Sequence, residues 1–260
     1  MDYNLQGKSA LVTGGSHGIG LAICESLGRA GCRVAFCGRT LERLDKAKDY
    51  LDSLSIENLA IQADVLQEYD CRKVLSTIKD QWSGVDILIN NVGGGGRWGK
   101  ENVETTDLTV WDEVYTKNAR AAIIFTTGSI PYMRAQKWGR VITITSKLGK
   151  EGGGRPWFNM AKASEVSLMK TLSLTKYLVR DGITFNSVAP GGIYIEGTGF
   201  EQEKKANEEK FHAEIDAHFP LGRMGRPDEV AHLVAFLSSE LSSLINGAQI
   251  TVDGGESKAF

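Results

Sequence analysis

The feature that most constrains this chain is a glycine-rich turn between an apolar strand and a helix. Positions 10–12 read Ala-Leu-Val, and positions 13–20 read Thr-Gly-Gly-Ser-His-Gly-Ile-Gly. Glycine reaches backbone conformations closed to other residues and lets a ligand approach the main chain. The helix that follows offers unpaired N–H groups and the positive end of its dipole. This combination is typical of a site that binds a phosphate or pyrophosphate group.

The turn taken alone leaves a second interpretation open. Its glycines follow the spacing G-x-x-x-G-x-G, which differs from the common dinucleotide pattern G-x-G-x-x-G. A tight strand-to-helix turn that binds no ligand would use glycine in the same way. If the turn does bind a phosphate, the residues expected to contact it are Gly14, Ser16, His17, Gly18, Ile19 and Gly20.

Strands and helices alternate along the rest of the chain. Short, nearly continuous apolar runs predict strands at 33–38, 59–63, 85–90, 140–145, 183–188 and 248–252. Such runs are typical of strands covered on both faces in a parallel sheet. Helices are expected at 41–54, 69–82, 107–137, 157–180 and 227–237. The alternation predicts a single α/β domain over residues 1–260, a doubly wound parallel sheet of about seven strands flanked by helices on both faces.

Charge, hydropathy and cysteine spacing narrow the class of protein. A formal net charge of −2 gives no basic surface for nucleic acid or an anionic membrane. The chain has neither a transmembrane run of about 18 apolar residues nor the start of a signal peptide, so a cytoplasmic location is expected. The four cysteines lack C-x-x-C spacing, so buried free thiols are expected, and neither disulfides nor a metal site.

Residues after the second and third strands suggest the nucleotide that is bound. In a dinucleotide fold the end of the second strand meets the adenosine ribose, where arginine accommodates a 2′-phosphate and an acidic residue binds a free hydroxyl. Arg39 stands there, and His17 could add a second positive group. Asp64 and Val65 follow the third strand and are expected at the adenine. The alternative is that Arg39 is a solvated surface residue.

Taken together, these motifs resemble the short-chain dehydrogenase/reductase family over essentially the whole chain. The tail, at 222–230 and 246–255, looks like the 3-oxoacyl-carrier-protein reductase branch. The resemblance implies a single Rossmann-type domain, a nicotinamide cofactor and a homotetramer, and Arg39 makes NADP(H) the expected cofactor. It also implies cofactor contacts from Asn91, Gly93, Pro190 and Ile193. The segments that carry the resemblance are 13–20, 64–65, 90–93, Asn118, Ser146, Lys162 and 190–191.

The same resemblance implies catalytic roles, and one of them lacks its residue. In the family a serine polarises the substrate carbonyl, a tyrosine transfers the proton, and a lysine four residues later lowers the tyrosine pKa and holds the nicotinamide ribose. An asparagine completes the proton path. Ser146, Lys162 and Asn118 match, but Phe158 occupies the tyrosine position. The spacing from Ser146 to Phe158 is also one residue shorter than the commonest family spacing, and no tyrosine occurs between 132 and 177.

Phenylalanine keeps the ring and loses only the hydroxyl, so the fold and the cofactor pocket are expected to survive without the proton donor. The leading hypothesis is an NADP(H)-dependent oxidoreductase acting on a ketone or secondary alcohol with an altered proton-transfer step. Lys162 acting through water, or Tyr194, could restore part of the lost rate. The alternatives are a non-redox NADP-binding pseudoenzyme or sensor, and a reductase inactivated by engineering tyrosine to phenylalanine.

One charged segment and five loop cations are expected near the mouth of the site. The charged stretch 191–220 is interpreted as a substrate lid, with a plain solvated helix pair as the alternative. Loop cations suggest an anionic substrate, one that carries a carboxylate, a phosphate or an acyl-thioester carrier, although a mixed solvated surface would look the same. These cations are Arg97, Lys100, Lys147, Lys150 and Arg155.

Overall fold

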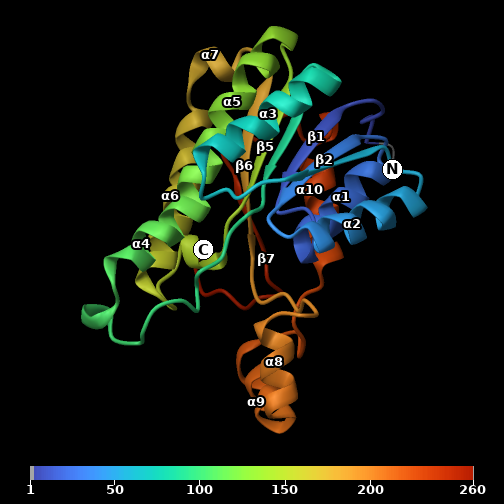
Figure 1. Cartoon of the computed structure of the whole chain (residues 1–260). Coiled ribbons are helices and arrows are strands. Elements are labelled where there is room, and N and C mark those ends of the chain that lie inside the picture. Colours follow the sequence, from blue (N-terminus) through green and yellow to red (C-terminus); the bar gives the residue numbers. More distant parts are fainter. Residues whose placement is uncertain (1–2, 260) are drawn as a thin grey trace.

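A computed structural model describes residues 3–259, in which seven strands form one parallel sheet with helices on both faces (Figure 1). The order across the sheet is β3-β2-β1-β4-β5-β6-β7, and every neighbouring pair is parallel. The α/β doubly wound sheet of seven strands is therefore confirmed. The strands are β1 (Ser9–Thr13), β2 (Arg33–Gly38), β3 (Asn58–Gln62), β4 (Ile87–Asn90), β5 (Gly139–Ile144), β6 (Ile183–Pro190) and β7 (Gln249–Val252).

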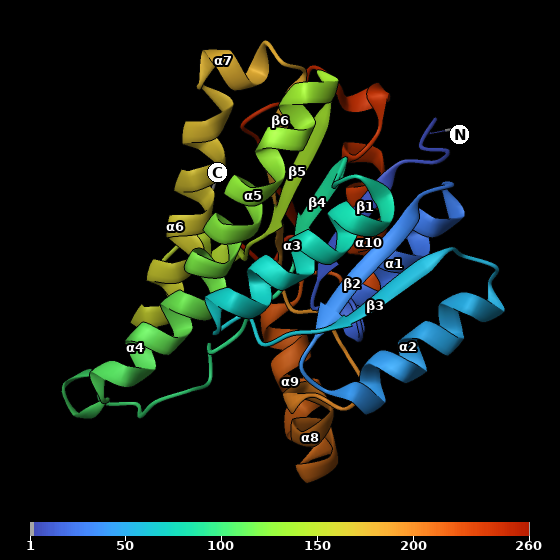
Figure 2. The same ribbon diagram turned by 45° about the horizontal axis from the view of Figure 1, so that its top comes forward.

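The helices divide between the two faces, and each set packs on its own apolar core (Figure 2). One face carries α1 (Gly18–Arg29), α2 (Leu41–Ser53) and α10 (Pro227–Leu237). The other carries α3 (Glu68–Trp82), α5 (Ala121–Gln136) and α6 (Pro156–Ser173), with α4 (Leu108–Tyr115) against α6 and α7 (Lys176–Val179) after it. No helix within residues 3–259 has the length and apolarity needed to cross a bilayer.

The central strands explain why the apolar runs in the sequence are nearly continuous. β1, β4, β5 and β6 are buried along their whole length, because helices cover both faces of a parallel sheet. β3 lies at the edge and is only partly covered. The sheet therefore directs the carboxyl ends of its strands, and the loops that follow them, toward one edge of the molecule.

Three predicted elements differ from the observed ones. The helix expected over 107–137 is interrupted by a π-helical turn, Thr116–Arg120, because the Asn118 side chain donates to the carbonyl of Val114 and an extra residue enters the turn. The helix expected to reach 180 ends at Ser173. The sixth strand runs on to Pro190, because its last residues pair with β7.

The four cysteines are buried free thiols, as predicted. Burial raises the pKa of both Cys32 and Cys37 to about 12 and the pKa of Cys71 to about 11. Since the thiolate is the reactive form, these side chains serve as small apolar groups in the core.

The segment expected to act as a lid forms two helices beyond the carboxyl edge of the sheet. They are α8 (Gly199–Ala206) and α9 (Glu208–His218), and they extend from the body of the molecule in Figure 1. Their outer surfaces are strongly charged, and Ile215 is the buried residue of α9. The helix pair is thus present, and its role as a lid stays a prediction.

Candidate functional site

A groove of about 270 Å³ lies at the carboxyl edge of the sheet, above β1, β2 and β4. The chain runs from β1 outward through β2 and β3 and then returns to β4 on the other side of β1. Parallel sheets bind ligands at such a reversal of strand order. The groove is lined by Gly14, Ser16, His17, Gly38, Arg39, Thr40, Arg43, Ala63, Asp64, Val65, Leu66, Asn91, Val92, Gly93 and Lys117.

The glycine-rich turn has the geometry that a phosphate site needs. Gly14 and Gly18 have φ of +67° and +56°, a region in which residues with a Cβ are strained. A Cβ on Gly20 would come within 2.3 Å of the Gly14 carbonyl oxygen. His17 caps α1 in extended conformation without a side-chain hydrogen bond to the first turn. The first N–H groups of α1, at Gly18, Ile19 and Gly20, thus have no side-chain cap and can serve an anion.

A hydrogen-bonded clamp fixes this turn to the loop after β4. The Thr13 hydroxyl accepts from the N–H groups of Asn91 at 2.9 Å and Val92 at 3.0 Å. The Asn91 amide donates in return to the carbonyls of Thr13 at 2.9 Å and Gly14 at 3.2 Å. The two loops that border the groove are therefore held at a fixed separation, so that little ordering is required when a ligand binds.

The groove is rich in positive charge. Arg39 and Arg43, which follow β2, line it together with His17 and with Lys117 from the π-helical turn, and Asp64 is the one carboxylate among the lining residues. Burial and the charge of Arg39 lower the pKa of Lys117, whose ammonium also lies 4.6 Å from the centre of the Trp98 ring. Such a cluster suits a phosphate dianion.

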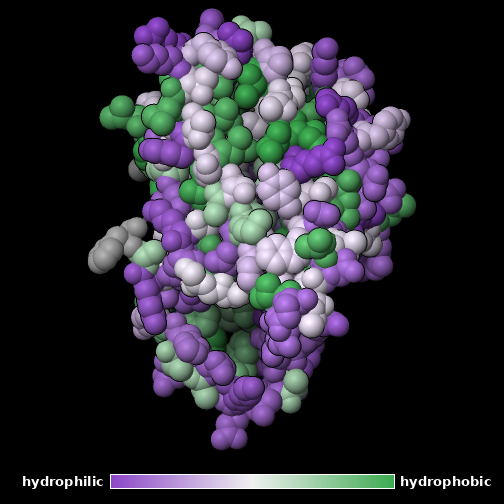
Figure 3. Space-filling view, turned by 90° about the vertical axis from the view of Figure 1, so that its left-hand side faces the viewer, coloured by the Kyte–Doolittle hydropathy of each residue, from purple (hydrophilic) through white to green (hydrophobic). Residues whose placement is uncertain are grey.

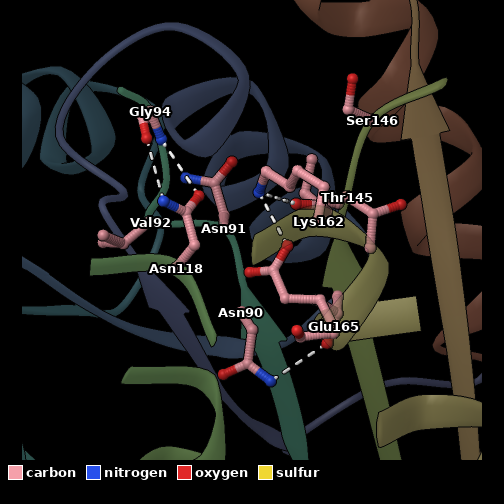
Figure 4. Close-up of polar contacts among 12 residues, drawn as sticks. Asn90, Asn91, Val92, Gly94, Asn118, Thr145, Ser146, Lys162 and Glu165 are labelled. Atoms are coloured by element: carbon pink, nitrogen blue, oxygen red, sulfur yellow. Dashed lines mark hydrogen bonds and ion pairs between the residues drawn. The ribbon is translucent and has the colours of Figure 1, made fainter. Parts of the chain in front are cut away.

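Asn118 and Lys162 meet at Gly93, one of the residues that line the groove. The Asn118 amide donates to the Gly94 carbonyl at 2.9 Å and accepts from the Gly94 N–H at 3.2 Å (Figure 4). The Lys162 ammonium donates to the Ile144 carbonyl at 3.1 Å and to the Glu165 carboxylate at 2.8 Å. A Cβ on Gly93 would lie 2.8 Å from Asn118 Oδ1 and 2.9 Å from Lys162 Nζ, so only glycine fits between them.

Ser146 stands apart from this pair. Its hydroxyl accepts from the Leu148 N–H at 3.2 Å and so caps the 3₁₀ turn Lys147–Gly149. In Figure 4 the side chain points away from Lys162. The Ser146 proton is not used in that bond, because the hydroxyl acts as the acceptor, and it stays available to a carbonyl oxygen.

Phe158 belongs to an aromatic cluster beside Lys162. The ring packs against the small core of Val114, Trp157 and Ala161, as Trp98 and Trp111 also do, and its centre lies 5.8 Å from the Lys162 ammonium. Trp157 is fully buried and donates to the Gly95 carbonyl at 3.3 Å. Met160, which could have closed a pocket around the ring, is 54% exposed. The ring of Phe158 is therefore only partly covered.

Pro190 and Ile193 lie at the end of β6 and shortly after it. Both side chains are buried, and neither is among the residues that line the groove. The segment is anchored through its backbone, because the Gly192 N–H donates to the Glu256 carboxylate at 2.6 Å and Ile193 bridges Gly225. Their expected contact with a cofactor stays a prediction.

A second and larger recess, of about 760 Å³, lies under α8 and α9. Figure 3 shows a hollow with apolar walls between hydrophilic rims at the end of the molecule where these helices lie. Its apolar lining comes from Phe200, Phe211, Ile215, Phe219 and Met224, and its polar lining from Glu203, Asn207, Lys210, Glu214, His218 and Glu256.

Two of the cations expected around the mouth are already paired. Arg97 lies 3.0 Å from Glu203 and 4.5 Å from the Phe200 ring, so it joins the loop after β4 to α8. Lys147 lies 3.3 Å from Glu151 and 3.0 Å from Glu256. These pairs reduce the free positive charge available to an anionic substrate.

The sequence interpretation missed three residues of this region: Arg43, Lys117 and Glu165. Arg43 and Lys117 neighbour residues that were singled out, but nothing in their own pattern marks a ligand. Glu165 carries a clearer signal. It falls on the stripe 157, 161, 165, 169 and 173, whose other members are apolar or small, and the structure buries all five. A carboxylate at helical spacing on a buried stripe indicates a partner, here Lys162 at i−3.

Comparison with known proteins gives consistent relatives. The family described as enoyl-(acyl carrier protein) reductase matches residues 14–257. The 3-oxoacyl-[acyl-carrier-protein] reductase FabG of Aquifex aeolicus is 35% identical over 257 residues, which is 98% of this chain and 99% of that protein. The acetoacetyl-CoA reductase of Cupriavidus necator is 32% identical over 250 residues, 95% of this chain and 97% of that protein.

Solved structures agree with this similarity. L-sorbose reductase from Gluconobacter frateurii, complexed with NADPH and L-sorbose, superposes with a TM-score of 0.92 at 28% identity and covers 100% of both chains. A variant of actinorhodin polyketide ketoreductase with NADPH superposes with a TM-score of 0.89 at 28% identity, covering 97% of this chain and 98% of that one.

Proposed function

Because the chain belongs to the short-chain dehydrogenase/reductase family, we propose that it is an NADP(H)-dependent oxidoreductase that interconverts a ketone and a secondary alcohol. One observation carries the proposal: Lys162, Gly93 and Asn118 are packed together beside a groove that begins at the glycine-rich turn. When bound, the nicotinamide would supply or accept the hydride.

The residues around the groove have distinct tasks under this proposal. The turn and the first N–H groups of α1 bind the pyrophosphate, as the φ values of Gly14 and Gly18 support. Asp64 and Val65 contact the adenine, and Arg39 with His17 binds the 2′-phosphate. Asn91, Gly93, Lys162, Pro190 and Ile193 hold the nicotinamide half, and Ser146 donates a hydrogen bond to the carbonyl oxygen.

The proton step is the weak point of the site. Phe158 has no proton to give, and general acid–base catalysis is typically worth 10²–10⁴-fold. The Lys162 ammonium has three N–H bonds, two of which are used by Ile144 and Glu165, so one is left to act through water. Tyr194 packs edge-to-face on Phe211 with centroids 6.4 Å apart and would have to leave α9 to serve instead.

A second candidate function follows from the same missing hydroxyl. A chain that keeps the cofactor groove and lacks the acid could bind NADP(H) as a non-redox sensor or pseudoenzyme. A reductase disabled by replacement of tyrosine would look identical. NADPH oxidation measured with a panel of ketones separates turnover from binding alone, and the same panel applied to Phe158→Tyr separates a disabled site from a specialised one.

The recess under α8 and α9 bears on the substrate class. Its phenylalanine-rich wall suits a ketone with an apolar chain, such as a 3-oxoacyl thioester. An anionic group is less supported, because Arg97 and Lys147 are already paired. Comparing 3-oxoacyl thioesters with short neutral ketones would test this preference.

Replacing Arg39 by alanine should weaken NADPH binding by about 10- to 100-fold and leave NADH binding unchanged, since a hydrogen bond to a charged group contributes about 1.5–3 kcal/mol. Within residues 3–259 Arg39 forms no ion pair, so its guanidinium is free for the 2′-phosphate. Calorimetry with both cofactors measures the effect. Arg29→Ala, which removes an exposed arginine of α1 paired with Glu25, serves as the control. Equal affinities of the unmodified chain for NADPH and NADH would contradict the assignment.

We also propose that the chain assembles as a homotetramer in the cytoplasm, as the family resemblance implies. Large apolar side chains are exposed on α4, α5 and α7 and at the end of α6, among them Leu108, which is 74% exposed, Tyr115, Ile123, Leu174 and Tyr177. Burying such side chains against another copy would favour association.

A further inference from the structure

Glu165 is a buried carboxyl group to which the reaction described above assigns no task. It lies three residues after Lys162 on α6 and is 1% exposed. Charged residues are almost never fully buried unless they are paired. Glu165 therefore requires a structural reason for its position, and its single partner within the described part of the chain is Lys162.

The contacts fix the lysine rather than the glutamate. Lys162 is 3% exposed, and Nζ lies 2.8 Å from Glu165 Oε2 and 3.1 Å from the Ile144 oxygen. Gly93 closes the third side, because a Cβ there would lie 2.9 Å from Nζ. The ammonium is thus held in one place, and Figure 4 shows it directed at Glu165 and the end of β5.

The environment makes the two charges depend on each other. Glu165 Oε1 and the nearby Asn90 Oδ1 have no hydrogen-bond partner within residues 3–259. Burial raises the pKa of Glu165, and the charge and hydrogen bond of Lys162 oppose that rise. Neither group has another counter-ion in this range, so loss of either charge leaves the other uncompensated in a medium of low polarity.

We propose that Glu165 is a positioning residue, the fixed counter-ion that holds the charged Lys162 side chain beside Gly93 at the edge of the cofactor groove. This role rests on the proposed NADP(H) site and adds a residue to it. Phe158 places an uncharged ring 5.8 Å from the ammonium, so Glu165 is the one source of negative charge on α6 that faces it.

Other elements around Lys162 present few charges. The π-helical turn contributes Lys117, whose pKa is lowered mainly by burial and in part by the Lys162 charge. The 3₁₀ turn Lys147–Gly149 carries Lys147, which is paired with Glu151 and Glu256, and α4 carries Asp112 and Glu113. β5 presents a backbone carbonyl, and the loop after β4 presents Gly93. The positive charge of Lys117 repels that of Lys162. The carboxylate of Glu165 therefore has to offset both the burial of Lys162 and this repulsion.

The test is the pH dependence of NADPH binding in Glu165→Gln, measured by fluorescence titration between about pH 7.5 and 9.5. Glutamine keeps the shape and one hydrogen bond but removes the charge, and burial then favours the neutral amine of Lys162. We expect the variant to lose about tenfold or more in affinity across this range, and the unmodified chain to change by less than about threefold. Glu25→Gln, which removes a surface carboxylate paired with Arg29, should behave like the unmodified chain.

Each outcome separates this role from a merely structural one and from failure of the proposed function. A lower melting temperature with an unchanged pH profile would contradict the counter-ion role. If the unmodified chain does not bind NADPH at about pH 7.5, the proposed function fails instead. Should Glu165→Gln not fold, Glu165→Asp and Glu165→Ala replace it: aspartate should keep the flat profile and alanine should lose it, and equal profiles would overturn the proposal.

Discussion

Replacing Phe158 by tyrosine is expected to raise the rate of NADPH-dependent ketone reduction by about 10²–10⁴-fold, the range that general acid catalysis supplies. The new hydroxyl lies one helical turn before Lys162 on the same face of α6. There the ammonium lowers the phenol pKa toward the working range, and the hydroxyl can reach a carbonyl held by Ser146.

The partial exposure of the ring favours this outcome over destabilisation. A hydroxyl buried without a partner would cost about 1–3 kcal/mol, but Met160 is turned outward and leaves the ring of Phe158 partly open. We therefore expect an unchanged melting temperature. The spacing between Ser146 and position 158, one residue shorter than is common in the family, is the feature that would limit the gain.

Steady-state rates of both forms with a panel of ketones measure the effect. Phe236→Tyr adds a hydroxyl to a partly buried ring of α10, away from the groove, and should change nothing. Lys162→Met combined with Phe158→Tyr should abolish the gain. Unchanged stability without any gain in rate would count against the missing-acid account, and loss of an existing activity would indicate chemistry that needs the apolar ring.

Replacing Lys162 alone by methionine is expected to destabilise the protein by about 3–5 kcal/mol, because it leaves the buried carboxylate of Glu165 without its partner. The double replacement Lys162→Met with Glu165→Leu should recover most of that loss, since apolar residues of similar volume often substitute for a buried ion pair without penalty. Urea denaturation at one fixed protein concentration measures both effects.

The destabilisation should depend on pH with a definite sign. Burial holds the pKa of Glu165 above its ordinary value even with the lysine present, and without the lysine nothing opposes that rise. The native state then binds a proton more tightly than the unfolded state, so stability falls as pH rises from the ordinary glutamate pKa through the raised one. The loss relative to the unmodified chain should be small at about pH 4.5 and largest above neutrality.

Lys46→Met provides the matched control, because Lys46 pairs with Glu42 on the surface of α2, where both side chains are largely exposed. Exposed ion pairs contribute little, so no measurable change is expected at any pH. A loss for Lys162→Met that is equally large at about pH 4.5 and about pH 8 would show that packing of the lysine stem, rather than the charge pair, stabilises this part of α6.

The fold was largely predictable, because each central strand is an apolar run that the sheet buries completely. β5, at 139–144, differs by one residue from its prediction, and α10 begins at Pro227 as expected. The interruption of the helix at Asn118 could not be predicted in the same way. The Asn118 side chain that donates to the Val114 carbonyl is also held by Gly94, which is distant in the sequence and meets Asn118 only after folding.

The candidate site was predictable where a residue type needs a particular backbone. The φ values of Gly14 and Gly18 follow directly from the glycine pattern. Partnerships between side chains were harder. Arg97 pairs with Glu203 and Lys147 pairs with Glu256, and each pair joins segments that are far apart in the sequence. Two of the cations expected to meet a substrate are therefore neutralised by carboxylates of this chain.

The short spacing of Lys162 and Glu165 also affects how this site can evolve. Both partners lie on one helix, so the ion pair forms whether phenylalanine or tyrosine occupies position 158. Codons for phenylalanine and tyrosine differ only at their second base. A lineage could therefore lose or regain the ring hydroxyl through a single nucleotide change while the fold persists. Position 158 is thus a place where selection can exchange catalytic turnover for cofactor binding alone.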